Sequence, residues 1–215
     1  PRGTGPLGFL ENQGDCGDAY NFAPTDDLPY VFDQLLPTFA TALETAQGNL
    51  VVVEQRLLLP ESLYPLDRES RSEELAALSC EFTYTLMHHT ALVPLHLRVD
   101  NLAKDHRLRI GFRPFAIKRV IARTIDGSPI ERPLHKPAEW RCTYTHPHSG
   151  WILLEGTNKE TLAIYALGLR EYELSADGTL YLTVIRAIDW ISRSDLSTRR
   201  FGAGPQIYVP EAQMQ

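Results

Sequence analysis

Residues 80–86 read Cys80-Glu-Phe-Thr-Tyr-Thr-Leu86 and alternate between less polar and more polar side chains. Successive side chains of a β-strand point to opposite faces of the sheet, so this alternation predicts a strand with one buried face. Cys80, Phe82, Tyr84 and Leu86 would share that face. The segment therefore favours an antiparallel sheet that is covered on one side.

Segments with strand character recur along the chain. The run 50–59 is rich in Val and Leu and is bounded by Gly48 and Pro60. Further strands are expected at 95–100, 108–113, 151–155, 161–166, 171–174 and 179–185. The pair 95–100 and 108–113, joined by the polar stretch 101–106, is expected to form a hairpin. Many strands separated by regular turns predict an all-β fold, an antiparallel β-sandwich.

The stretch 33–46 differs from the rest of the chain. Its apolar residues recur at approximately helical spacing, with Pro37 inside the pattern. We expect a short helix or an irregular connection there.

Composition limits the function classes. The 215 residues are 43% hydrophobic and 22% charged, typical of a globular protein, and the simplest organisation is a single domain, 1–215. A net charge of −6 gives no electrostatic footprint for nucleic acid, and no apolar run approaches the roughly 20 residues of a membrane helix. A neutral or polar ligand is the better expectation.

The number and spacing of the cysteines indicate the redox state of the cellular compartment. Cys16, Cys80 and Cys142 are odd in number and lack paired spacing, and the chain has no Asn-x-Ser/Thr site. This pattern favours a reducing, cytoplasmic location. Because the chain opens at Pro1 rather than Met, we expect the natural N-terminus and any targeting signal to lie upstream.

The stretch 12–22 combines two acids, two glycines and an aromatic residue, Tyr20, within a few residues. Gly14 and Gly17 permit tight turns that would present Asp15 and Asp18 beside Tyr20. Glycoside hydrolysis uses two carboxylates, so an acid–base pair is one interpretation of the two aspartates. Two acids three residues apart in a Gly-rich loop are more often turn formers, and a sugar-binding or loop-positioning role is the favoured interpretation.

Other candidate sites are weaker. His146 and His148 would share one face of an extended segment and could chelate a metal, but no acid or cysteine is nearby and structural histidines are the favoured interpretation. No nucleophile elbow or phosphate loop is present in the sequence. Arg132, before Pro133, could bind hydroxyls or a carboxylate, although an ordinary surface arginine is the simpler interpretation.

Five ordered motifs carry a resemblance that no single motif could. They are Gly14-Asp-Cys-Gly-Asp-Ala-Tyr-Asn-Phe-Ala-Pro24, Val99 to Arg109, Gly168-Leu-Arg-Glu-Tyr-Glu173, Leu182-Thr-Val-Ile-Arg186, and Gly204-Pro with Pro210 to Gln213. From about Gly14 to Gln213 the sequence resembles the C-terminal half of α-mannosidases of glycoside hydrolase family 38, closest to the bacterial-type members.

The resemblance implies a supersandwich of the galactose mutarotase-like kind, preceded in the intact enzyme by a catalytic α/β barrel and a helical linker domain. The barrel would hold the zinc ion and the two aspartates of a retaining mechanism, so no catalytic residue and no metal ligand is assigned to this chain. Asp15, Asp18 and Tyr20, in a loop that approaches the barrel, and Arg132, in an Arg-Pro loop, become candidate substrate-binding residues. Cys16 and Ala19 depart from the family pattern, which puts hydrogen bonds from those two side chains in doubt.

The leading hypothesis is therefore a C-terminal domain that completes the mannoside cleft of an α-mannosidase, is inactive alone and has the catalytic barrel as its partner. Further copies of the same chain are also expected as partners in a homo-oligomer, because such enzymes commonly assemble. The alternative is an autonomous carbohydrate-binding module. A third hypothesis, a mutarotase-like enzyme, requires groups such as His89, His96 and His146 to converge in one pocket.

Overall fold

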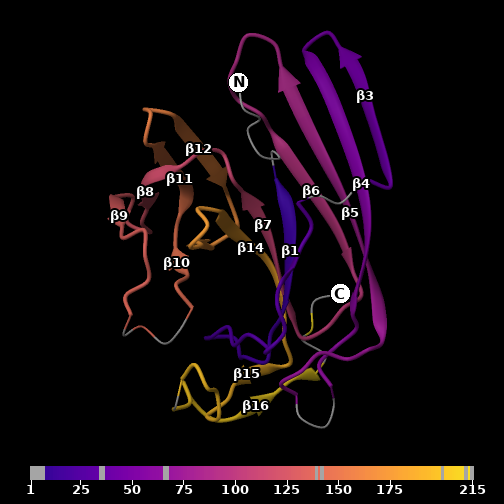
Figure 1. Cartoon of the computed structure of the whole chain (residues 1–215), viewed down its shortest axis with the longest axis vertical. Helices are drawn as coiled ribbons and strands as arrows, with labels where there is room; N and C mark the ends of the chain where they lie inside the picture. The colour runs from indigo at the N-terminus through magenta and orange to yellow at the C-terminus, as the bar shows by residue number, and fades with distance from the viewer. Residues whose placement is uncertain are drawn as a thin grey trace.

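The computed structural model describes residues 8–33, 37–64, 68–138, 140, 143–199, 201–210 and 213. Within these ranges the chain forms sixteen β-strands and no α-helix, so the predicted all-β fold is confirmed (Figure 1). No helix in this part of the chain could cross a membrane.

A six-stranded antiparallel sheet occupies the centre of the molecule, in the order β10-β13-β14-β7-β1-β2. Its strands are β10 (His146–Pro147), β13 (Glu171–Leu174), β14 (Leu180–Ala187), β7 (His106–Phe112), β1 (Phe9–Gly14) and β2 (Tyr30–Val31). The sheet therefore combines the first strand with strands from the last third of the chain.

Two four-stranded antiparallel sheets flank the central one. The first is β3 (Phe39–Thr45), β4 (Gly48–Pro60), β5 (Leu75–Met87) and β6 (Leu95–Asn101), in that order. The second has the order β12 (Thr161–Ala166), β11 (Gly150–Gly156), β8 (Ile117–Arg123) and β9 (Pro129–Arg132). A small sheet of β15 (Trp190–Ser192) and β16 (Ile207–Tyr208) lies at the lower end in Figure 1.

One hydrophobic core joins the three large sheets. Tyr172, Leu182, Ile110 and Leu10 are register partners across four neighbouring strands, so they lie on one face of the central sheet. Buried side chains of both four-stranded sheets belong to the same cluster, including those of β4, β5, β8 and β11. The two outer sheets thus cover this face of the central sheet, which makes the predicted β-sandwich.

Two expectations from the sequence are wrong. The stretch 33–46 contains strand β3 and, in its described part, no helix, because residues 39–45 pair antiparallel with the Val-rich β4 through the two-residue turn 46–47. Residues 34–36 lie outside the described residues. Pairing with a strong β-forming strand overrides the weak helical spacing of the apolar residues.

The predicted hairpin of 95–100 with 108–113 does not form either. Strand β6 pairs with β5 in an outer sheet, whereas β7 pairs with β1 and β14 in the central sheet. The segment between them crosses from one layer of the sandwich to the other. Both segments are strands as expected, but alternation along a strand does not specify its partner.

Truncation of a central core residue tests the packing. Leu108 of β7 is fully buried, so Leu108→Ala should lower the free energy of unfolding by about 3 kcal/mol, from lost apolar burial and the cavity left behind. The measurement is urea denaturation followed by circular dichroism. Leu167→Ala is the control: Leu167 is 90% exposed, and its truncation should change stability by less than about 0.5 kcal/mol. Equal effects of the two substitutions would contradict the assigned core.

Candidate functional site

The loop of residues 14–24 follows β1 and lies beside β15 at the lower end of the molecule (Figure 1). Backbone hydrogen bonds fix its two ends: the amide of Asp15 donates to Asp105 at 2.8 Å, and the amide of Cys16 donates to Ala23 at 2.8 Å. Its tip is held to β15, because the amide of Ala19 donates to the carbonyl of Trp190 at 3.0 Å. The loop is therefore anchored along its whole length.

Asp15 is buried and organises the inside of the loop. One carboxylate oxygen accepts hydrogen bonds from the amides of Gly17 at 2.9 Å and Ala23 at 3.2 Å. The other accepts from Nε of Arg186 at 2.8 Å. With three donors and no exposure, the carboxylate of Asp15 closes the loop onto itself and onto β14.

Gly17 is required by the close approach of the two sides of the loop. A Cβ atom at this position would lie 2.0 Å from the carbonyl oxygen of Asn21 and 2.8 Å from the amide nitrogen of Ala23. These are backbone atoms, which cannot move away without opening the loop. Any larger residue at 17 would therefore destroy this conformation.

Asp18 has no solvent exposure and accepts hydrogen bonds on both of its carboxylate oxygens. The amides of Tyr20 and Asn21 donate to one oxygen at 3.0 and 2.9 Å, and the amide of Arg193 donates to the other at 2.9 Å. The guanidinium of Arg199 forms an ion pair with the same carboxylate. Burial alone would raise the pKa of Asp18, but these donors outweigh it and hold the pKa below its ordinary value.

Tyr20 is the side chain that the loop presents to solvent. It is 62% exposed, and the guanidinium carbon of Arg199 lies 5.8 Å from the centre of its ring. Its backbone amide is fixed by Asp18. Tyr20 thus combines a constrained backbone with an accessible aromatic ring and hydroxyl.

Three arginines that sequence reasoning did not single out complete the site. Arg186 lies on β14, and Arg193 and Arg199 follow β15. Besides the contacts with Asp15 and Asp18, Arg193 donates to the carbonyl of Cys16 at 2.9 Å and Arg199 to the amide oxygen of Asn21 at 2.6 Å. Arg186 ends one of the five motifs, Leu182 to Arg186, but no local pattern marks any of the three arginines as a site residue, because the loop residues that they bind lie at least 168 residues away.

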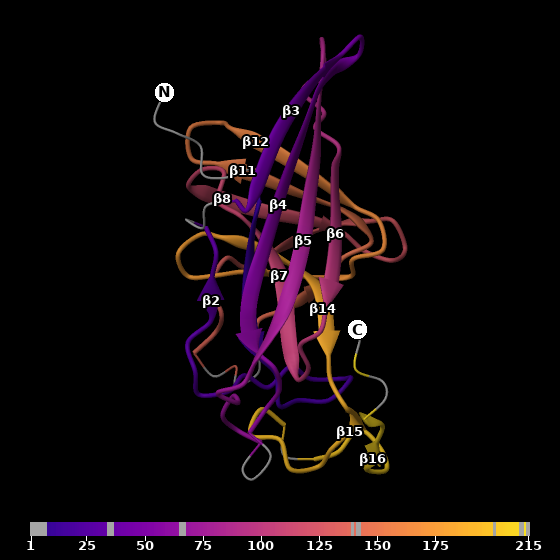
Figure 2. The same cartoon turned by 90° about the vertical axis from the view of Figure 1, so that its right-hand side faces the viewer.

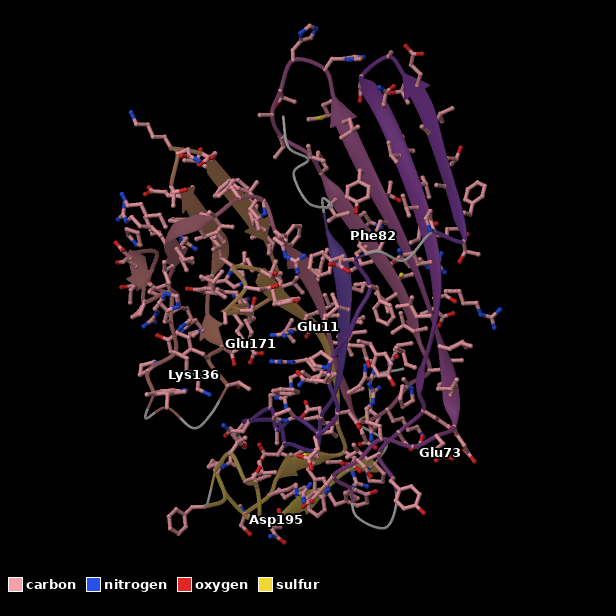
Figure 3. All side chains as sticks on the ribbon, in the orientation of Figure 1. Glu11, Glu73, Phe82, Lys136, Glu171 and Asp195 are labelled. Atoms are coloured by element: carbon pink, nitrogen blue, oxygen red, sulfur yellow. The ribbon has the colours of Figure 1, made fainter. Side chains whose placement is uncertain are left out.

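The loop is also fastened to the polar face of the central sheet. The guanidinium of Arg107, on β7, lies 3.5 Å from the centre of the Phe22 ring and is almost completely buried. Beside it Arg109 forms ion pairs with Glu11 at 2.6 Å and Glu173 at 2.8 Å. Burial, followed by the nearby charge of Arg109, lowers the pKa of Arg107 to about 10. Figure 3 shows Glu11 in the middle of the molecule, on β1.

A groove of about 460 Å³ opens beside the loop. Ala19 lines it from the loop, Arg186 from β14 and Trp190 from β15. Glu171 and Arg170 add opposite charges from the start of β13. The groove thus combines aliphatic walls, one indole ring and a few charged groups, and Ala19 is the loop residue that lines it.

Arg132 is not part of this cluster. It lies on β9, the edge strand of an outer sheet, where its charge acts on His146 and Tyr172. In Figure 3 Lys136, four residues after Arg132, lies at the side of the molecule, whereas Asp195, two residues after Arg193, lies at the lower end. The structure brings Asp15, Asp18 and Tyr20 together in one loop and leaves Arg132 apart from them.

The histidines do not form a common site. His146 and His148 pack against Tyr172, with ring centres 5.6 and 6.0 Å away, and burial lowers the pKa of both. The described residues hold no group of three or more metal-ligating side chains. His96 lies on β6 of an outer sheet and His89 follows β5, so neither converges with His146 on β10 and the mutarotase-like hypothesis is wrong.

The ion pair of Asp18 gives a stability test. Asp18→Asn keeps the shape but removes the charge, and should lower the free energy of unfolding at pH 7 by about 2–3 kcal/mol, because Arg199 loses its buried partner but keeps some solvent contact. Since the pKa of Asp18 is depressed, this contribution is complete above the unfolded pKa of about 4 and is lost as the pH falls through the folded pKa.

Denaturation of both proteins at a series of pH values measures the difference. Asp195→Asn is the control, because Asp195 is exposed and pairs with Arg193 at the surface, where an ion pair contributes less than about 1 kcal/mol. If the wild type still exceeded Asp18→Asn by the same free energy of unfolding at pH 2, a charge-based role for Asp18 would be contradicted.

Comparisons with known proteins identify relatives of this fold. No protein-family model matches the sequence. A protein of Halalkalibacterium halodurans named "Putative mannosylglycerate hydrolase" is 24% identical over 205 residues, which cover 86% of this chain and 22% of that protein.

Two solved structures are also similar. An α-mannosidase from Enterococcus faecalis V583 superimposes with a TM-score of 0.82 at 23% identity, and a glycosyl hydrolase family 38 protein from Enterococcus faecalis with a TM-score of 0.77 at 22% identity. Each match covers 95% of this chain and 24% of the other. The chain thus spans about a quarter of the length of these relatives, and the resemblance to family 38 is confirmed at the level of the fold: this β-sandwich is one that α-mannosidases of the family contain.

Proposed function

We propose that this chain is the C-terminal β-sandwich of a family 38 α-mannosidase, and that the loop of residues 14–24 forms one wall of its substrate cleft. The observation that carries the proposal is an exposed tyrosine on a loop locked by two buried carboxylates, in a fold shared with an α-mannosidase. A rigid loop with one accessible aromatic hydroxyl suits a sugar, whose ring stacks on aromatic faces and whose hydroxyls need fixed partners.

In this proposal the chemistry takes place on the part of the enzyme that the chain does not contain. A general acid must hold its proton near neutral pH, which requires a raised pKa, whereas the pKa of Asp18 is lowered. Both loop aspartates are also enclosed by donors. A catalytic barrel, with a zinc ion that binds sugar hydroxyls and two aspartates for double displacement through a mannosyl-enzyme, would supply the reaction.

The site residues then have distinct roles. Asp15 and Asp18 act on the substrate through the shape of the loop, since their oxygens already accept hydrogen bonds from the protein. Tyr20 is the direct substrate contact. Arg132, on β9, would meet the substrate only at a separate wall of the cleft.

An α-mannoside is the proposed substrate class. The names of the similar proteins, an α-mannosidase and a mannosylglycerate hydrolase, support it. A cytoplasmic location is proposed with it: Cys16 and Cys80 are free thiols, as expected in a reducing compartment, and Cys142 lies outside the described residues.

One observation favours a second candidate function, an autonomous carbohydrate-binding module. The groove that Ala19 lines is also lined by Trp190, and an indole next to charged groups can hold a sugar without a catalytic domain. Calorimetry with mannose and mannobiose distinguishes the two functions: a wall of a shared cleft should give no measurable heat, whereas a binding module should saturate.

The isolated chain should not hydrolyse an activated α-mannoside, with or without added zinc, because both loop aspartates are enclosed by donors and the pKa of Asp18 is lowered. The measurement is release of the chromophore over hours at high protein concentration. A complete α-mannosidase serves as the positive control. Turnover that rises in proportion to the concentration of the 215-residue chain would overturn the proposal that the catalytic residues lie outside this chain.

Tyr20→Phe in the complete polypeptide should reduce kcat/KM for an α-mannoside about tenfold, because loss of one hydrogen bond to a hydroxyl is worth about 1–1.5 kcal/mol. Tyr165→Phe is the matched control, since Tyr165 is 70% exposed but lies on β12 of an outer sheet and does not belong to the loop. Unchanged kinetics for Tyr20→Phe would remove Tyr20 from the substrate wall.

A further inference from the structure

Strand β3 is an open sheet edge with unusual properties. It pairs with β4 on one side and with no other described strand, so a row of its backbone groups has no partner in the sheet. All seven of its residues are exposed. Its register with β4 runs without a bulge from Phe39 to Thr45.

Natural sheets protect such edges with charges, prolines, bulges or short strands. The other described edges show these devices: β2 and β10 have two residues each, β9 begins with Pro129 and contains two charged residues, and β6 carries His96, Arg98 and Asp100. Strand β12 has no charge, but alternate residues are half-buried. By contrast β3, with the sequence Phe-Ala-Thr-Ala-Leu-Glu-Thr, has one charged residue and no proline within its seven exposed positions.

The edge is also accessible. Figures 1 and 2 show that the end of the sheet formed by the β3–β4 hairpin extends beyond the other two large sheets. Phe39 and Leu43 project from the same face of β3 and are 50% and 59% exposed. Within the described part of the chain, the outer side of β3 is therefore open to another strand.

The backbone groups that face outward follow from the hairpin. Thr45 and Gly48 flank a two-residue turn, and such a flanking pair exchanges backbone hydrogen bonds. Bonded and non-bonded pairs alternate along an antiparallel ladder, so every second residue counted back from Thr45 faces β4. The remaining residues direct their N–H and C=O groups to the open edge: Ala40, Ala42 and Glu44.

We propose that β3 pairs with β3 of a second copy of this chain, antiparallel and centred on Ala42, to form a continuous eight-stranded sheet. A two-fold axis at Ala42 relates two identical edges. Each copy uses its only β3 edge in the contact, so the assembly is complete with two copies. The register is self-complementary in charge and size. Glu44 lies opposite Ala40, so the one acid of each strand avoids its counterpart, and Leu43 lies opposite Thr41 on the face that also carries Phe39.

The mass of the chain in solution tests the pairing. Light scattering after size exclusion, over a series of concentrations, should show a shift from 24.3 kDa toward twice that mass. A chain that stays monomeric throughout the series would overturn the proposal.

Charge substitutions at the two-fold axis test the register. Ala42→Glu places two carboxylates opposite each other, with Cβ atoms about 5 Å apart, and should give a monomer, as should Ala42→Lys. An equimolar mixture of the two variants should regain the doubled mass as a heterodimer, which also shows that both are folded. Failure of the mixture to associate would overturn this register.

Ala163→Glu is the matched control on β12, a six-residue edge strand with no charged residue, where Ala163 is exposed. It should leave the dimer intact. Loss of the dimer in Ala163→Glu with retention in Ala42→Glu would assign the contact to β12 and overturn the proposal for β3.

Discussion

Two buried carboxylates join the beginning of the chain to its end. Asp15 and Asp18, in the loop after β1, pair with Arg186 and Arg199, which lie 171 and 181 residues further along. Burial of a carboxylate is costly unless a cation and further donors surround it, and here backbone amides and guanidinium groups do so. The conformation of the loop therefore depends on the fold of the C-terminal strands, and the loop cannot be a local turn that forms by itself.

The central sheet makes this connection possible because both of its faces are buried at β7. Residues 107–110, Arg-Leu-Arg-Ile, alternate between charged and apolar side chains, a pattern that normally marks a strand with one face in water. Instead Arg107 and Arg109 lie under the rings of Phe22 and Tyr181, at 3.5 and 4.1 Å from the ring centres. Their aromatic cover and the carboxylates of β1 and β13 replace the solvent, so the polar face supports the loop.

Local patterns predict local structure well in this protein and predict partners poorly. The strand at 80–86 follows from alternation, the strands at 151–155 and 161–166 are also predicted close to their observed bounds, and the sandwich follows from the number of strands. The strand at 39–45 could not be predicted because its Ala and Leu residues also suit a helix, and only pairing with β4 decides between them. Likewise Asp15, Asp18 and Tyr20 stand out in a Gly-rich loop, but Arg193 and Arg199, which bind this loop, have no local signal.

If the loop forms a wall of a substrate cleft, as proposed, the charge state of Asp18 explains how the domain would influence catalysis without performing it. A carboxylate that donates or accepts a proton during turnover must keep a pKa near the working pH and a free oxygen. Asp18 meets neither condition, since its donors depress its pKa and enclose both oxygens. The same donors remove the freedom of the backbone on either side of Tyr20, and a binding group that is already in place loses little entropy when a ligand arrives. The features that disqualify the loop as an acid–base site are therefore those that would make it an effective rigid wall.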